Sequence, residues 1–210
     1  MTNTNYHQKN TISKNVKITI WIIMSLFFLF YQEYKPYSSQ IHMINSLGMY
    51  IFALYQFVIN QTLGIVHEGG HGICYILPCP KFFTALNGTL FQWLFPLGIS
   101  IYYKKKGNIM AYTFALFIFA ISLDYTAWYM STAHQGAFVP ASKSFLGVDG
   151  YHDFYMIFTT LHILEYDGII SAITKFFSVI IMFFSLFRMF LEAFGSDSKK
   201  KLDTHFNSSK

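Results

Sequence analysis

Residues 47–71 read LGMYIFALYQFVINQTLGIVHEGGH, and this stretch decides how the rest of the chain is interpreted. Its first part, Leu47 to Val66, carries no charge over a length that suits a membrane-spanning helix of about 17–25 residues. Its second part, HEGGH at residues 67–71, places ionisable side chains directly after this run. Such side chains are costly at membrane depth and usually have a function. The stretch therefore predicts a membrane helix that ends in a functional site.

The whole chain of 210 residues has the composition of a membrane protein. Hydrophobic residues make up 53%, aromatic residues 20% and charged residues 12%, and this charged share is about half of that in an ordinary soluble domain. The composition excludes a disordered chain, a nucleic-acid-binding arm and a conventional soluble enzyme. The formal net charge of +5 does not indicate an acidic partner, because the lysines stand at segment ends, as they do in membrane proteins.

Four further apolar stretches predict membrane helices, so we expect an all-α, polytopic transmembrane bundle of about five spans. These stretches are Ile18–Tyr31, Phe82–Tyr103, a segment from Gly107 through Asp124, and Gly168–Phe187. Residues Tyr151–Leu164 carry apolar side chains at helical spacing. They predict one amphipathic helix that lies at the membrane interface or packs back on the bundle.

The chain divides into a polar N-terminal tail at residues 1–17, a transmembrane domain at 18–194 and a polar, lysine-bearing tail at 195–210. We expect a multi-pass protein of a bacterial inner membrane. Five spans place the termini on opposite sides, and the lysines of residues 104–106 and of the C-terminal tail favour a cytoplasmic C-terminus. The expected partners are membrane lipid and a membrane-protein or peptide substrate, but no nucleic acid.

The motif at residues 67–71 fits the zinc-binding pattern HExxH. On a helix, His67 and His71 lie on one face about one turn apart, so both imidazoles reach a single Zn²⁺ ion. Glu68 projects to the side, where it holds a metal-bound water as the general base of peptide hydrolysis. Two adjacent glycines, each about 1 kcal/mol worse than alanine in a helix, suggest that backbone or substrate approaches closely. These features favour a metal site over a structural histidine pair.

A catalytic zinc ion usually has three protein ligands, so a third ligand is needed beside the two histidines. Asp124 ranks first, because a carboxylate inside a membrane segment is costly unless it pairs or binds a cation. The adjacent His152 and Asp153 rank second, although capping of a helix N-terminus also explains them. Asp167 ranks third, because Asp167-Gly168 is typical of a turn. Sequence separation leaves these alternatives open.

Two cysteines, Cys74 and Cys79, follow the motif around Pro78 and Pro80. They are too few for a disulfide framework and are either free thiols or one bridge. Cys74 lies one helical turn after His71, where plain packing explains it better than metal ligation.

HEGGH in a transmembrane segment resembles the motif of the intramembrane zinc metalloproteases of the site-2 protease type. That family commonly has a glycine directly before the second histidine, as Gly70 is here. It also places a Gly-x-x-x-Asn-like element in the next membrane segment. Residues 88–92, GTLFQ, are similar in spacing, with Gln92 in place of asparagine. The resemblance implies that the Gln92 amide contacts substrate or the oxyanion.

The family's third zinc ligand is the aspartate of a Leu-Asp-Gly sequence two segments after HExxH. Leu123-Asp124 occupies the matching span, with tyrosine in place of the glycine, whereas Asp167-Gly168 has the glycine but lies one span later. The resemblance extends over about Leu47 to Gly168 and looks closest to small bacterial membrane proteins grouped with these peptidases.

These observations together predict an intramembrane zinc endopeptidase that hydrolyses a peptide bond in or near a membrane-embedded substrate segment. Two alternatives use the same histidine pair. One is a non-catalytic membrane scaffold. The other is a transporter or metal-handling protein that binds the ion transiently.

Overall fold

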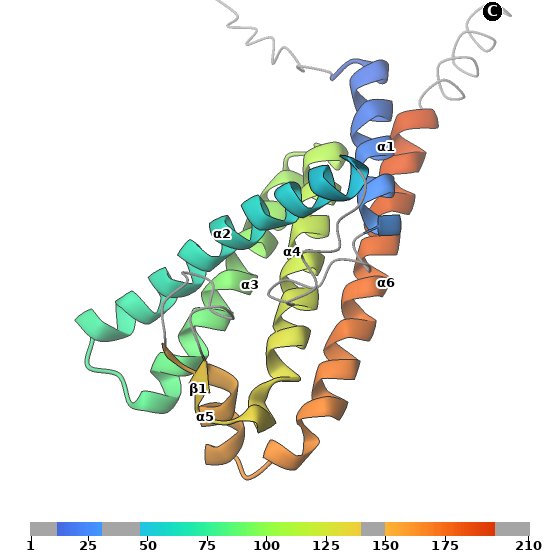
Figure 1. The fold of residues 1–210 in the computed structure, drawn as a ribbon. Helices are drawn as coiled ribbons and strands as arrows, with labels where there is room; N and C mark the ends of the chain where they lie inside the picture. Colours follow the sequence, from blue (N-terminus) through green and yellow to red (C-terminus); the bar gives the residue numbers. More distant parts are fainter. Residues whose placement is uncertain (1–11, 31–46, 140–149, 196–210) are drawn as a thin grey trace, which may run out of the picture.

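The computed structural model describes residues 12–30, 47–139 and 150–195, and these residues are mostly helical (Figure 1). The elements in chain order are α1 (Lys14–Phe30), α2 (Leu47–Ile76), α3 (Lys81–Lys105), α4 (Ile109–Met130), the 3-10 helix η3 (Ala133–Gln135), β1 (Phe138–Val139), β2 (Gly150–Tyr151), α5 (Asp153–Thr160), the 3-10 helix η5 (Leu164–Tyr166) and α6 (Asp167–Phe194). The two short strands form one antiparallel pair. The expected all-α class is confirmed, while most of both polar tails lies outside the described residues.

Local sequence signals set the helix ends. The turn between α2 and α3 contains Pro78, and Pro80 occupies the N-cap position of α3, where a missing backbone N–H is tolerated. α3 ends shortly before Gly107, whose φ of 72° is a left-handed conformation that glycine adopts easily. Asn108 then caps α4, because its side chain accepts a hydrogen bond from the backbone N–H of Ala111 at 3.1 Å.

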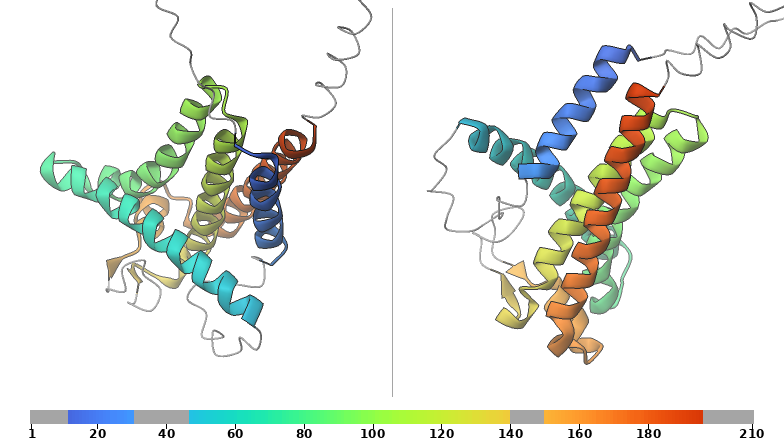
Figure 2. Two further views of the ribbon diagram at one scale, coloured as in Figure 1. Left: turned by 90° about the horizontal axis from the view of Figure 1, so that it is seen from above. Right: turned by 90° about the vertical axis from the view of Figure 1, so that its right-hand side faces the viewer.

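The five long helices pack one on the next in the order α1, α6, α4, α3 and α2. α4 lies between α6 and α3, and α2 crosses α3 obliquely at the outside (Figure 1; Figure 2). A buried cluster that includes Phe27, Phe117 and Met182 joins α1, α4 and α6. A second cluster, which includes Phe154 and Phe158, joins α5 to α3 and α4. This second cluster holds α5 against the bundle.

Two helices, α4 and α6, are long and apolar enough to cross a membrane. The described parts of all five stretches that predict spans are mostly helical, but within residues 12–30, 47–139 and 150–195 only these two helices meet that criterion. α6 leaves large apolar side chains exposed, among them Phe176, Phe183 and Phe187, whereas a helix in the core of a soluble protein would bury them. Five crossings stay a prediction.

The predicted amphipathic helix at residues 151–164 is shorter in the structure. α5 contains only residues 153–160, and it buries Phe154, Ile157 and Phe158. The apolar spacing thus reports packing against the bundle, which was one of the two alternatives that the sequence allowed. Residues 140–149 of the preceding loop lie outside the described residues.

The start of α1 and the last turns of α6 lie at the same end of the bundle, where Lys17 Nζ and the Glu192 carboxylate form an ion pair at 2.5 Å. We call this the lysine end, because α3 also ends here with Lys104 and Lys105 (Figure 1). α1 and α2 both start toward this end and do not alternate in direction (Figure 1). The expectation that the termini lie on opposite sides of a membrane stays a prediction.

Candidate metal site

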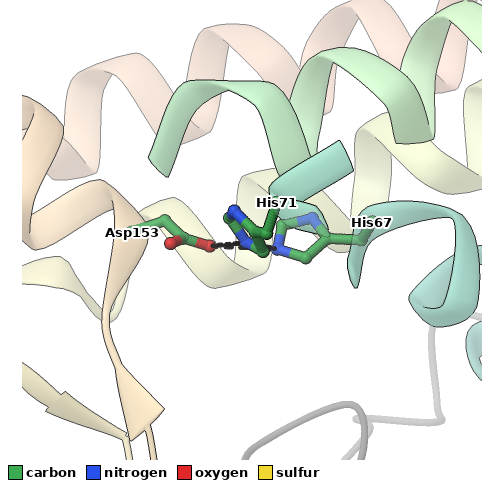
Figure 3. Close-up of side chains that lie close together, drawn as sticks. All are labelled: His67, His71 and Asp153. Atoms are coloured by element: carbon green, nitrogen blue, oxygen red, sulfur yellow. Dashed lines mark hydrogen bonds and ion pairs between the residues drawn. The ribbon is translucent and has the colours of Figure 1, made fainter. Parts of the chain in front are cut away.

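Three side chains converge at the other end of the bundle: His67 and His71 from α2, and Asp153 from the first turn of α5 (Figure 3). Nε2 of His67 lies 3.0 Å from Nε2 of His71 and 3.0 Å from Oδ2 of Asp153. Nε2 of His71 lies 3.3 Å from the same oxygen. Both imidazoles are buried and the carboxylate is partly buried. The two motif histidines therefore share one point in space with a single carboxylate.

Hydrogen bonds at the other ring nitrogens determine which atoms face this point. His67 Nδ1 donates to Oε1 of Gln92 at 3.1 Å, and His71 Nδ1 donates to the backbone carbonyl of Thr84 at 2.7 Å. Because these oxygens only accept, both Nδ1 atoms carry hydrogen, and in the neutral rings both Nε2 atoms present lone pairs. Metal-binding histidines usually have this arrangement, with the second ring nitrogen donating to a carbonyl or carboxylate.

The three converging atoms fit a metal ion. Two nitrogen lone pairs and a carboxylate oxygen only 3.0–3.3 Å apart repel one another unless a positive charge lies among them. That charge is either a proton on one ring or a metal ion. Tetrahedral zinc, with bonds of about 2.0–2.1 Å to nitrogen and oxygen, has ligand-to-ligand distances of roughly 3.3 Å. The measured separations lie close to this value, and three protein ligands leave a fourth position for water or substrate.

Two glycines let α3 lie directly against the histidines. A Cβ atom on Gly88 would lie 2.5 Å from Nε2 of His71 and 2.8 Å from Cε1 of His67. A Cβ atom on Gly70 would overlap with the backbone carbonyl of Asn87. Interiors packed to crystal density do not accept such overlaps, so a side chain at either position would displace α3 from α2. Close helix packing therefore accounts for the second glycine of HEGGH.

Asp153 is positioned by its neighbours in α4 and α5. His152 is the N-cap of α5: its Nδ1 accepts a hydrogen bond from the backbone N–H of Tyr155 at 3.4 Å, and its Nε2 lies 3.0 Å from Oγ1 of Thr132. Its ring stacks on Tyr129 with centroids 4.2 Å apart. The Tyr129 hydroxyl accepts a hydrogen bond from the N–H of Asp153 at 3.2 Å. His152 therefore caps the helix, while Asp153 faces the histidines.

The charge states of α5 suit these roles. Burial lowers the pKa of His152 to about 4, and the nearby Asp153 charge offsets this only in part. The ring is thus neutral near pH 7, and its Nδ1 is able to accept a hydrogen bond. Burial alone would raise the pKa of the Asp153 carboxyl, but the hydrogen bonds and charges of His67 and His71 outweigh it and hold this pKa below its ordinary value. Asp153 is therefore ionised, as a metal ligand must be.

Asp124, the first-ranked third ligand, does not belong to this group. α4 turns Ser122 and Thr126 toward α3, to which both are hydrogen-bonded. Asp124 is two positions from each, which puts it on the opposite side of the helix, and its carboxylate interacts with the charge of Lys175 on α6. One of its oxygens is buried and has no hydrogen-bond partner among the described residues.

Asp167, the third-ranked candidate, also lies elsewhere. Its carboxylate accepts hydrogen bonds from the N–H and Nδ1 of His134, at 3.1 and 2.7 Å, and from the N–H of Gly168 at 2.6 Å. Asp167 thus joins η3 to the first turn of α6. Of the four candidate ligands, the structure brings only Asp153 to the histidine pair.

No family model, curated protein or solved structure matches this chain. The similarity to site-2 proteases therefore rests on the motif residues alone. A functional assignment rests on the geometry around the two histidines.

Gln92 has a different contact from the one that the resemblance implies. Its side chain is 2% exposed, and its carbonyl oxygen is hydrogen-bonded to His67, so it supports the candidate metal site. Its amide nitrogen is buried without a hydrogen-bond partner in the described part of the chain. A buried donor of this kind is unusual and leaves the amide able to bind a further acceptor.

Glu68 follows His67 directly and is half-buried. Its negative charge acts on both His71 and Tyr129, so the carboxylate is within electrostatic range of the site. It is not among the three converging groups. If an ion binds to the three converging groups, Glu68 would lie near it without being one of its ligands.

Sequence reasoning missed two contributors to the site. The backbone carbonyl of Thr84 holds His71, and no sequence pattern reports a backbone contact of this kind. The Tyr129 hydroxyl binds the start of α5, and one tyrosine among 15 has no distinguishing signal. The close approach of Gly88 to both imidazoles also depends on how α3 packs against α2, so the sequence alone does not report it.

Proposed function

We propose that this chain is a membrane-embedded zinc peptidase of the site-2 protease type, which hydrolyses a peptide bond in or near a membrane-embedded segment of its substrate. The observation that carries the proposal is the meeting of two imidazole nitrogens and the Asp153 carboxylate beside Glu68. Two histidines and one carboxylate suit zinc. The Gly70 and GTLFQ similarities to that family add support, and the protein would be a multi-pass protein of a bacterial inner membrane.

In this proposal, different residues of the chain bind the metal ion, orient its ligands and transfer the proton. His67, His71 and Asp153 would hold the zinc ion, and Gln92 and Thr84 keep the two rings in the ligating tautomer. When bound, zinc lowers the pKa of a water molecule and polarises a carbonyl group. Glu68 takes the proton from the attacking water and passes it to the leaving amine as the C–N bond breaks.

The test is a comparison of Glu68→Gln with wild type in zinc content and in cleavage of tagged single-span membrane proteins. We expect the variant to bind stoichiometric zinc and to lose cleavage, since only the proton acceptor has changed. Glu165→Gln, an exposed carboxylate in η5, is the matched control and retains both. Normal cleavage by Glu68→Gln contradicts the mechanism. Wild-type protein without stoichiometric zinc favours the scaffold alternative, and weak, exchangeable zinc favours metal handling.

A further inference from the structure

The turn between α2 and α3 is closed by a disulfide between Cys74 and Cys79, whose Cα atoms lie 5.1 Å apart. Cys74 is three residues after His71, and its sulfur accepts a hydrogen bond from Nδ2 of Asn87 at 2.9 Å. We call this end of the bundle, opposite the lysine end, the disulfide end. Disulfides persist in oxidising compartments and are rare in the cytosol. The covalent bond therefore indicates that the disulfide end faces an extracytoplasmic compartment.

A second, independent observation concerns the lysine end. The basic residues at the helix ends there are Lys14, Lys17, Lys104, Lys105 and Lys106. On the disulfide side, the described ends of the long helices carry one lysine, Lys81 at the start of α3. Short segments rich in lysine and arginine stay on the cytoplasmic side of a membrane. The charge distribution therefore places the lysine end in the cytoplasm.

The two candidate spans connect these ends. α4 begins next to Lys106 and runs to η3 at the disulfide end, and α6 runs back from Asp167 toward Glu192 (Figure 1). Thiol chemistry and charge asymmetry are unrelated properties, yet both give the chain the same orientation. We infer that the metal site lies at the extracytoplasmic side of the membrane. The start of α1 and the end of α6 then both face the cytoplasm.

This orientation defines which substrates reach the site. His71 is separated from Cys74 by less than one helical turn of α2. Asp153, in the first turn of α5, lies at the same end of the bundle. The substrate is therefore a polypeptide whose cleaved bond lies at the extracytoplasmic leaflet or emerges from it. The choice of substrate rests on the proposed peptidase function, whereas the sidedness of the bundle does not depend on cleavage.

Labelling of single introduced cysteines tests the orientation. Glu165→Cys in η5 and Lys105→Cys at the end of α3 both replace exposed residues outside the metal site, and the native cysteines are bonded to each other. Bacterial cells that express each variant are treated with a membrane-impermeant maleimide before and after permeabilisation. We expect full labelling of Glu165→Cys in intact cells, and labelling of Lys105→Cys to rise from background to full only after permeabilisation.

The reverse pattern, or equal labelling of both positions in intact cells, overturns the inference. The wild-type protein provides a second measurement that needs no substitution. Alkylation of membranes without reductant, followed by mass spectrometry, should find Cys74 and Cys79 joined and unmodified, and two alkylated thiols would contradict an oxidising location. Neither readout involves cleavage, so failure of the peptidase proposal with Glu68→Gln is distinguishable from failure of the orientation.

Discussion

Gly88→Ala is predicted to impair metal binding, because α3 lies directly on the two ligand rings at this position. The added Cβ would be 2.5 Å from Nε2 of His71, the nitrogen that faces the candidate metal position, and 2.8 Å from Cε1 of His67. Ordinary van der Waals separation is about 3.5 Å or more, so the His71 ring must retreat by roughly 1 Å. Its Nδ1–H bond to the Thr84 carbonyl at 2.7 Å resists that movement.

A displacement of this size exceeds the tolerance of about 0.5 Å within which a binding constellation must be held. Overpacking of a fitted interior typically costs about 1–3 kcal/mol, and if that cost falls on the metal-bound form it weakens zinc binding by roughly 5- to 150-fold. Competition between the purified protein and a zinc chelator measures this change directly. Circular dichroism of the same samples shows whether the helices have been retained.

Gly69→Ala is the matched control in the motif itself. A Cβ at Gly69 has nothing within 4 Å, and alanine is the better helix former by about 1 kcal/mol. This variant should bind zinc as wild type does. Wild-type zinc affinity in Gly88→Ala would refute the reasoning, because the histidine rings could not then lie where the structure places them.

Three further predictions concern the supports of the site. Gln92→Ala should weaken zinc binding by about 10- to 100-fold in chelator competition, because His67 loses its Nδ1 acceptor, whereas Gln92→Glu retains an acceptor and should restore much of the affinity; equal affinities in all three proteins would contradict this. Zinc affinity should fall steadily as the pH is lowered from about 8 to about 5, because protons compete for the imidazole nitrogens, and a flat profile would argue against histidine ligation. The double variant Cys74→Ser and Cys79→Ser should lower the free energy of unfolding by about 2 kcal/mol in denaturant titration, from the entropy of so short a loop, and an unchanged midpoint would indicate that no disulfide forms.

The sequence was most informative where a local pattern corresponds to a local structure. The spacing of His67 and His71 along one helix places both imidazoles on one face without any tertiary information. The uncharged run before them predicts the helix that carries them, and the prolines and Gly107 mark where α2 and α3 end. The all-α class therefore follows from periodicity and composition.

The third ligand could not be chosen from the sequence, because it depends on how separate helices pack. Membrane cost favoured Asp124, yet α4 turns its hydrogen-bonding residues, Ser122 and Thr126, toward α3 and leaves Asp124 on the far side. Asp153 reaches the histidines because Phe154 and Phe158 bury α5 against α3 and α4. The apolar spacing in the sequence predicts that one face of α5 is buried, but it does not show which helices that face packs against.

The roles of Gln92 and Gly88 in α3 could not be predicted from the sequence either. Family spacing directed attention to Gln92 as a substrate contact, but the residue lies within hydrogen-bond distance of His67 once α3 approaches α2. The approach itself depends on Gly70 and Gly88, which come into contact across two helices. A pairwise contact of this kind is a property of the assembled bundle.

The most direct test of the central claim compares the zinc content of Asp153→Asn and Asp124→Asn, each purified beside the wild type. Both substitutions keep the shape of the side chain and remove its charge. We predict that Asp153→Asn loses zinc or binds it far more weakly, while Asp124→Asn retains the wild-type stoichiometry. Retention of zinc by Asp153→Asn, or its loss from Asp124→Asn alone, would contradict a site formed by His67, His71 and Asp153.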